Sequence, residues 1–191
     1  MNIDEVAHAL TTAVKVEIEN RHCTPQLQEY MAYIKQVAQF FTNPGPKFGL
    51  ALMGTPGNGK TTMARAIKAV IDTIAELAII NDRGGSKAEM VTAKQLVRLY
   101  RTDFDRWEKL CIRPFLIIDD FGEEPVEVMD YGNVINPVID LLSQRYDQQR
   151  LTIITTNVTN KQIRKTYGDR IADRFNEMMK VVVFASPSYR K

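Results

Sequence analysis

The sequence predicts an α/β fold of three layers, in which helices cover both faces of a parallel sheet. Three apolar runs predict it, at residues 49–53, 115–118 and 151–155. Each is short enough for a buried strand, and a helical pattern follows the first run and precedes the third. Polar residues of the kind that bind phosphate or metal follow all three runs, and ligands bind at the carboxyl ends of strands in such sheets.

The composition is that of one soluble globular domain of 191 residues, 45% hydrophobic and 25% charged. The net charge of +2 is too small to indicate nucleic-acid binding by itself, so any such surface would be local. Cys23 and Cys111 form no C-x-x-C pair, and His8 and His22 are the only histidines. These residues argue against a zinc site and favour a reducing cytoplasm over secretion. Neither a signal pattern nor an apolar run of about 18 residues occurs, so no membrane partner is expected.

Two amphipathic helices are predicted before the first strand. Residues 2–20 carry apolar side chains at helical spacing, which indicates either a packing face or a helix that binds a partner. Thr24 and Pro25 are typical of the start of a second helix, which ends at the turn Asn-Pro-Gly-Pro of residues 43–46. We therefore divide the chain into a short helical segment, 1–45, and an α/β domain, 46–191.

Residues 54–62 match G-x-x-x-x-G-K-S/T, the phosphate-binding P-loop, in the required context of strand, glycine loop and helix. The glycines let backbone N–H groups converge on phosphate oxygens, and the helix N-terminus adds a favourable field. Lys60 is expected to reach the β- and γ-phosphates of ATP, and the Thr61 hydroxyl to bind Mg²⁺. The predicted nucleotide-binding residues of this loop are Gly54, Thr55, Pro56, Gly57, Asn58, Gly59, Lys60, Thr61 and Thr62.

The P-loop helix is expected to continue to about Ile79, and a short strand at 90–92 precedes a helix over 93–109. That helix mixes basic and aromatic residues, including Arg98, Arg101 and Phe104. Such a mixture suits single-stranded DNA, because charge follows the phosphates and rings stack on bases. Acidic residues dilute the charge, however, and a solvated helix with its aromatic residues in the core stays open.

The second apolar run ends in Asp119 and Asp120, the pattern of a Walker B strand. Asp119 is expected to hold Mg²⁺, and Asp120 to orient or deprotonate the attacking water. An acidic loop follows, in which Glu123 or Glu124 could approach the metal, and then a helix over 133–148. The third run ends in Thr156 and Asn157, which either bind the γ-phosphate or the lytic water, or cap the next helix.

The last third of the chain is basic, and Arg170 and Arg174 share one helix face because they are four residues apart. They either stabilise charge at a neighbour's γ-phosphate or form ion pairs with Asp169, Asp173 or Glu177. A final core strand is predicted at 181–184.

Taken together, the P-loop, the I-I-D-D-F-G-E-E segment, T-T-N and the G-D-R-I-A-D-R-F box resemble the AAA+ ATPases of the bacterial helicase-loader group, the DnaC/DnaI type, and the related IstB transposition helpers. The resemblance covers roughly residues 25–191. It implies a parallel sheet of order 5-1-4-3-2 without a large C-terminal lid. It also implies that Asn157 is the sensor 1 residue, that Arg174 is the arginine finger with Arg170 as its companion, and that Arg190 in S-Y-R is a sensor 2 residue. Residues 93–109 correspond to an inserted helix that touches single-stranded DNA.

The implied function is that of an ATP- and Mg²⁺-dependent switch that loads or remodels a replicative hexameric helicase on single-stranded DNA, in an ATP-dependent homo-oligomer. The second acid, Asp120, has a shorter arm than the Glu of many AAA+ enzymes, which favours slow hydrolysis. A transposition helper that delivers a transposase is the alternative within the class. A nucleotide-sensing adaptor with little hydrolysis and a small-molecule P-loop kinase are alternatives of other classes.

Overall fold

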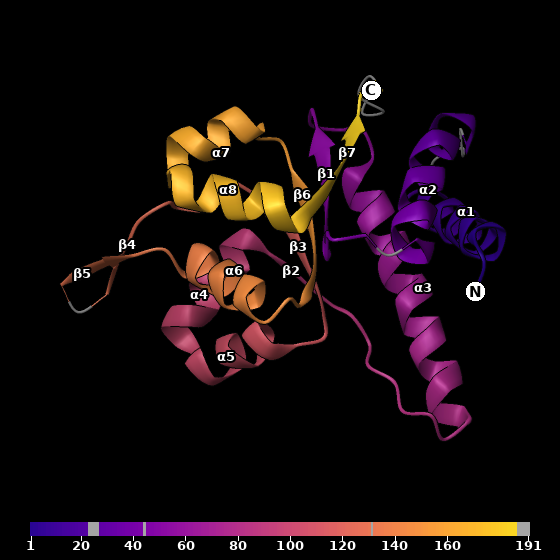
Figure 1. The fold of residues 1–191 in the computed structure, drawn as a ribbon, viewed down its shortest axis with the longest axis horizontal. Coiled ribbons are helices and arrows are strands. Elements are labelled where there is room, and N and C mark those ends of the chain that lie inside the picture. The colour runs from indigo at the N-terminus through magenta and orange to yellow at the C-terminus, as the bar shows by residue number, and fades with distance from the viewer. Residues whose placement is uncertain (23–26, 44, 131, 187–191) are drawn as a thin grey trace.

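The fold is built on a five-stranded parallel sheet of order β2-β3-β6-β1-β7 (Figure 1). This computed structural model describes residues 1–22, 27–43, 45–130 and 132–186. The strands are β1 (Gly49–Gly54), β2 (Glu89–Thr92), β3 (Phe115–Phe121), β6 (Leu151–Thr156) and β7 (Met179–Phe184). Counting these five in chain order gives 5-1-4-3-2, so the predicted order is confirmed.

Helices cover both faces of the sheet, as the buried runs predict (Figure 1). One face carries α1 (Ile3–Glu19), α2 (Leu27–Thr42) and α3 (Lys60–Ile80). The other carries α4 (Ala93–Thr102), α5 (Phe104–Ile112), α6 (Pro137–Asp147), α7 (Asn160–Tyr167) and α8 (Asp169–Met178). Successive side chains of β1 enter opposite cores, Leu50 and Leu52 on one side and Ala51 and Met53 on the other, which is the three-layer arrangement.

The apolar stripe of α1 is a packing face. Val6, Leu10 and Val14 are buried, and α1 lies against α2 and α3. Asn2 begins the helix through a capping box with Glu5. The predicted start of the second helix, Thr24 and Pro25, lies outside the described residues.

Two predicted helix boundaries are wrong. The helix expected over 93–109 is two helices, because the Asp103 side chain accepts the Arg106 N–H at 3.1 Å and begins α5 as its N-cap. The helix expected from residue 133 begins only at Pro137, with Asn136 as its N-cap. The residues before it form β5 (Asn133–Ile135), which pairs with β4 (Val128–Asp130) in a hairpin that protrudes from the body (Figure 1).

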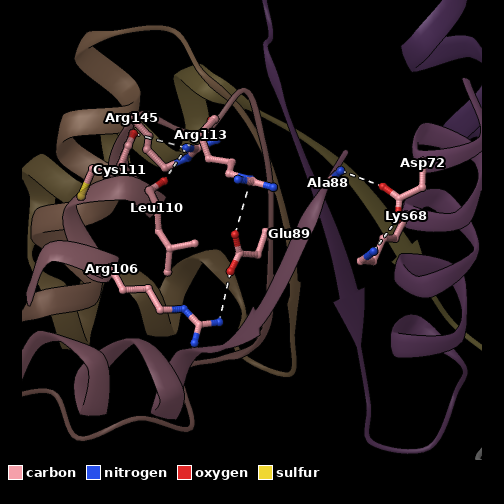
Figure 2. Close-up of polar contacts among 9 residues, drawn as sticks. All are labelled: Lys68, Asp72, Ala88, Glu89, Arg106, Leu110, Cys111, Arg113 and Arg145. Carbon is pink, nitrogen blue, oxygen red and sulfur yellow. Dashed lines mark hydrogen bonds and ion pairs between the residues drawn. The ribbon is translucent and has the colours of Figure 1, made fainter. Parts of the chain in front are cut away.

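A fully buried arginine of α6 joins the helical layer to the sheet. Arg145 donates hydrogen bonds to the carbonyl oxygens of Leu110 and Arg113, at 2.9 and 2.8 Å, and to the Thr152 hydroxyl at 2.8 Å. Figure 2 shows the guanidinium beside the last turn of α5. Burial lowers the pKa of Arg145 to about 10, and the carbonyl ends of α5 supply the negative field that keeps it charged.

Candidate nucleotide-binding site

The phosphate-binding loop joins β1 to α3 and requires two of its glycines. Gly54 and Gly59 have φ angles of 154° and 90°, which side-chain-bearing residues rarely adopt. A Cβ atom at Gly54 would lie 2.3 Å from the Phe184 carbonyl oxygen, and one at Gly59 would lie 1.9 Å from the Tyr30 hydroxyl. The loop is therefore enclosed by β7 on one side and by α2 on the other, so α2 forms part of the site.

The ammonium of Lys60 lies inside this loop. Its Nζ atom donates hydrogen bonds to the carbonyl oxygens of Gly54 and Thr55, at 2.8 and 2.7 Å, and to Oδ1 of Asn58 at 3.1 Å. Asn58 is itself buried and donates from Nδ2 to the Phe184 carbonyl oxygen at 2.7 Å. The sequence indicated that Asn58 belongs to the loop, but carried no signal for this tie to the last strand.

The first Walker B acid meets the P-loop threonine, as predicted. Asp119 is buried at the end of β3, and its Oδ1 atom accepts from the hydroxyls of Thr61 at 3.0 Å and Thr155 at 2.5 Å. A hydroxyl and a carboxylate are hard oxygen ligands, and Mg²⁺ in ATPase sites takes few protein ligands beside substrate phosphates and water. The pair of Thr61 and Asp119 therefore fits Mg²⁺. In the described part of the chain, no cluster of three or more His, Cys, Asp or Glu residues could hold a metal ion.

The second acid departs from regular strand geometry. Asp120 has a φ of 56°, and the register between β3 and β6 shifts between Ile118 and Phe121. The Asp120 N–H donates to the Thr155 hydroxyl at 2.9 Å. Asp120 is an exposed residue, but partial desolvation of its carboxyl raises the pKa of that group, with help from the charges of Asp119 and Glu123, while Lys60 and Lys94 oppose the shift. A carboxylate near Lys60 with a raised pKa is chemically suited to orient or deprotonate water.

Asn157 follows β6 and is half-buried, and its side chain forms no hydrogen bond with any described residue. The family resemblance implies the sensor role for Asn157. The hydroxyl that bonds to the Asp119 carboxylate and to the Asp120 N–H belongs to Thr155, which sequence reasoning missed. Two threonines precede Asn157, and the period-two alternation of a strand was the available signal for which of them faces the acids.

The two arginines of α8 differ in their surroundings. Arg174 lies 3.4 Å from a carboxylate oxygen of Asp147, and its guanidinium stacks over the Tyr146 ring at 4.8 Å from the ring centroid. Arg170 is exposed and forms no ion pair with the described residues. The expected ion-pair alternative named the wrong partner for Arg174, because α6 supplies the acid. Asp169 and Asp173 pair with Arg164 instead, and Glu177 accepts from the Tyr146 hydroxyl.

The loop after the Walker B strand is hydrogen-bonded to the end of α7, which directly precedes α8, the helix that carries Arg170 and Arg174. The Glu124 carboxylate is buried and accepts from the Gly122 N–H at 2.7 Å and the Tyr167 hydroxyl at 2.8 Å. Burial and this carboxylate raise the pKa of Tyr167. Both carboxylate oxygens of Glu124 accept hydrogen bonds from the protein, which does not favour the expected approach of Glu124 to a metal. Glu123 is exposed and lies 3.9 Å from Lys94.

The predicted DNA-binding residues lie on α4 and α5. Arg98 and Arg101 are exposed on α4 and line a groove of about 820 Å³, whose opposite wall is formed by Glu123, Glu124 and Pro125. Phe104 is 45% exposed and stacks on Trp107, which is buried. One aromatic residue of this segment thus belongs to the core and another to the surface. Arg190 lies outside the described residues, and no described helix is long and apolar enough to cross a membrane.

Comparison with known proteins gives a family and a fold. The model of the family described as IstB-like ATP binding protein matches residues 43–191. The DnaC helicase loader is similar in structure, with a TM-score of 0.63 and 22% identity over 84% of this chain and 93% of that chain. DnaI has a TM-score of 0.61 and 23% identity over 84% of each chain. The replication initiator DnaA bound to AMPPCP and single-stranded DNA has a TM-score of 0.55 and 15% identity over 83% of this chain and 47% of that chain. No curated protein matches the chain.

Proposed function

The chain belongs to the IstB-like ATP binding protein family, and from this premise we propose that it is a Mg²⁺-dependent ATPase that acts as a switch in DNA replication. Its output is the loading or remodelling of a replicative hexameric helicase on single-stranded DNA. The observation that carries the ATPase proposal is the convergence of Lys60, Thr61 and Asp119 around one loop at the carboxyl end of the sheet. The likeness in fold to helicase loaders supports the replication role.

Different residues of the proposed site bind the phosphates, bind Mg²⁺ and act on the attacking water. Lys60 and the N–H groups at the start of α3 bind the β- and γ-phosphates, and Thr61 and Asp119 hold Mg²⁺. Bound Mg²⁺ neutralises charge on the phosphates during phosphoryl transfer. Asp120 orients the attacking water and accepts its proton, and Asn157 donates a hydrogen bond to the γ-phosphate or that water.

A second copy of the chain completes the site. Arg174, with Arg170 beside it, stabilises the charge that develops at the γ-phosphate of the neighbouring subunit. Such a head-to-tail contact is heterologous, so it generates a ring or an open helix. The Arg98 and Arg101 face of α4, with Phe104 at its edge, binds single-stranded DNA through phosphate contacts and base stacking.

The test combines two measurements on the full chain. ATP turnover is measured with and without a single-stranded oligonucleotide, and bound protein is identified after pull-down with a hexameric replicative helicase or a transposase. We expect DNA-stimulated turnover and capture by the helicase. Capture by the transposase alone would favour a transposition helper, the candidate that the family's name supports.

Two other outcomes would replace the proposed class. Phosphate transfer to a nucleoside monophosphate would identify a small-molecule kinase. ATP binding without turnover, with and without DNA and the helicase, would identify a nucleotide-sensing adaptor.

A further inference from the structure

We propose that Thr155 is a positioning residue for ATP hydrolysis, because its hydroxyl group holds the two Walker B acids in one fixed arrangement. The inference rests on the proposed ATPase function and adds a role for Thr155 beside the one proposed for Asn157, which is to contact the γ-phosphate or the attacking water. Thr155 touches neither phosphate nor water in this role. It acts through Asp119 and Asp120.

The Thr155 hydroxyl forms one hydrogen bond with each of the two acids, as a donor to one and as an acceptor from the other. A threonine hydroxyl has one proton to donate and two lone pairs to accept with. Here the proton goes to Oδ1 of Asp119, at 2.5 Å, and a lone pair accepts the backbone N–H of Asp120, at 2.9 Å. The residue has no exposed surface, so water does not compete for either bond.

The second bond maintains an unusual backbone. Consecutive residues of a strand point to opposite faces, so two adjacent acids at the end of β3 would ordinarily be directed apart. The register shift and the left-handed conformation of Asp120 change that direction. A left-handed conformation is strained for a residue other than glycine and persists only where the surroundings enforce it. The Thr155 hydroxyl takes the Asp120 N–H that regular pairing would have bonded to a strand carbonyl, so it stabilises the distorted form.

The neighbouring threonine supplies a matched control. The Thr156 hydroxyl donates to the Phe121 carbonyl oxygen at 2.6 Å and accepts the Val158 N–H at 3.1 Å. It is buried in the same strand and contacts neither acid. Because these two partners engage its hydroxyl, the structure does not favour the phosphate or water contact that the sequence left open for Thr156. Replacement of either threonine by valine removes one hydroxyl from one buried position, so the two variants differ chiefly in whether the acids lose a partner.

The experiment compares the parent chain with Thr155→Val, Thr155→Ser and Thr156→Val. The affinity for a fluorescent ATP analogue, kcat, KM and the thermal midpoint are measured for each. We expect Thr155→Val to lower kcat about 10²-fold, the scale of a displaced general base, while nucleotide affinity changes little. Thr155→Ser should restore most of the turnover, because serine keeps the hydroxyl. Thr156→Val should lose stability and keep its kcat. A kcat of Thr155→Val close to that of the parent, or an equal loss in Thr156→Val, overturns the inference.

A second readout does not depend on turnover. Hydrogen exchange at the Asp120 amide should be slow in the parent and in Thr155→Ser, and faster in Thr155→Val, because only the last lacks the acceptor. If the parent chain does not hydrolyse ATP but this exchange pattern holds, the ATPase proposal fails and the positioning of Asp120 by Thr155 stands. If Asp120 exchanges equally slowly in Thr155→Val, the hydroxyl does not hold it and the inference is wrong.

Discussion

The two halves of the proposed site are built in opposite ways. The phosphate half is buried and internally bonded: Lys60 has three acceptors in its own loop, and Asp119 has two hydroxyl donors. The arginine half lies on α8, where Arg170 is exposed and Arg174 is held by the neighbouring helix α6. On the proposed function, a single chain binds the nucleotide, whereas the arginines act in hydrolysis at the site of a second chain.

A short connection joins the halves within one chain. Phe121, directly after the acids, lies 5.2 Å from the Tyr167 ring and 6.1 Å from the Phe175 ring, measured between centroids. The Tyr167 hydroxyl donates to Glu124 in the same loop. Direct packing therefore connects the segment after the acids to α7 and to α8, the helix that carries both arginines.

The largest expected effect comes from the phosphate half. Lys60→Ala removes the one ammonium inside the loop and leaves the carbonyl oxygens of Gly54 and Thr55 without this donor. We expect ATP turnover to fall by at least about 10²-fold, the scale for loss of one preorganised donor, together with ATP affinity. Titration with a fluorescent ATP analogue and an assay of phosphate release measure both. Lys35→Ala, an exposed position on α2, is the control. Unchanged affinity in Lys60→Ala would place the nucleotide elsewhere.

Most of the fold was predictable because its signals are local. The strands are continuous apolar runs, and the P-loop pattern fixes the strand before it and the helix after it. The strand order came from the family resemblance. The errors arose where one polar side chain decides a boundary: Asp103 and Asn136 cap new helices inside segments whose periodicity is helical throughout. Periodicity averages over a window and does not detect such a cap.

The contacts of the proposed site also fall into two groups, those that local motifs predict and those that depend on distant residues. The contact between Thr61 and Asp119 follows from two motifs whose strands are separated in the sheet only by β6. Thr155 and Tyr167 were missed, and Glu124 was given a different partner, because their roles depend on which distant residue each meets. Strand alternation could have separated Thr155 from Thr156, but a single sequence does not show which distant residues such side chains contact. The register shift at Asp120 was not predictable either, because aspartate, unlike glycine, is not a sequence signal for a left-handed conformation.

Substitution of the arginines on α8 is expected to affect DNA-stimulated ATP turnover but not ATP affinity. Arg174→Ala should lower DNA-stimulated turnover by up to about 10³-fold without loss of ATP affinity, because an arginine finger acts on the transition state. Arg170→Ala should give a lesser loss. A larger loss of turnover in Arg170→Ala would identify the exposed Arg170 as the arginine finger. Arg174 would then serve only to pack α8 against α6.

A mixing experiment tests whether the arginine acts between chains. Lys60→Ala keeps its arginines and loses its own phosphate half, whereas Arg174→Ala keeps the phosphate half and loses the finger. If the site is shared, an equimolar mixture should recover turnover that neither variant has alone. A mixture no more active than the sum of its parts contradicts a shared site.

The smallest expected effect is a loss of stability on substitution of Tyr167, which connects the loop after the acids to α7. Tyr167→Phe keeps the ring against Phe121 but removes the tyrosine donor to the buried Glu124 carboxylate, which keeps the Gly122 N–H, so the free energy of unfolding should fall by about 1 kcal/mol. Tyr146→Phe removes a similar tyrosine–glutamate hydrogen bond, to Glu177, at the surface, where water replaces it, and urea unfolding should show little change. If the connection also transmits the nucleotide state, Tyr167→Phe should retain basal turnover and lose part of its DNA stimulation, which Tyr146→Phe should not. Equal stability losses in the two variants would mean that the buried carboxylate finds another donor, and the loop and α7 would then be independent of each other.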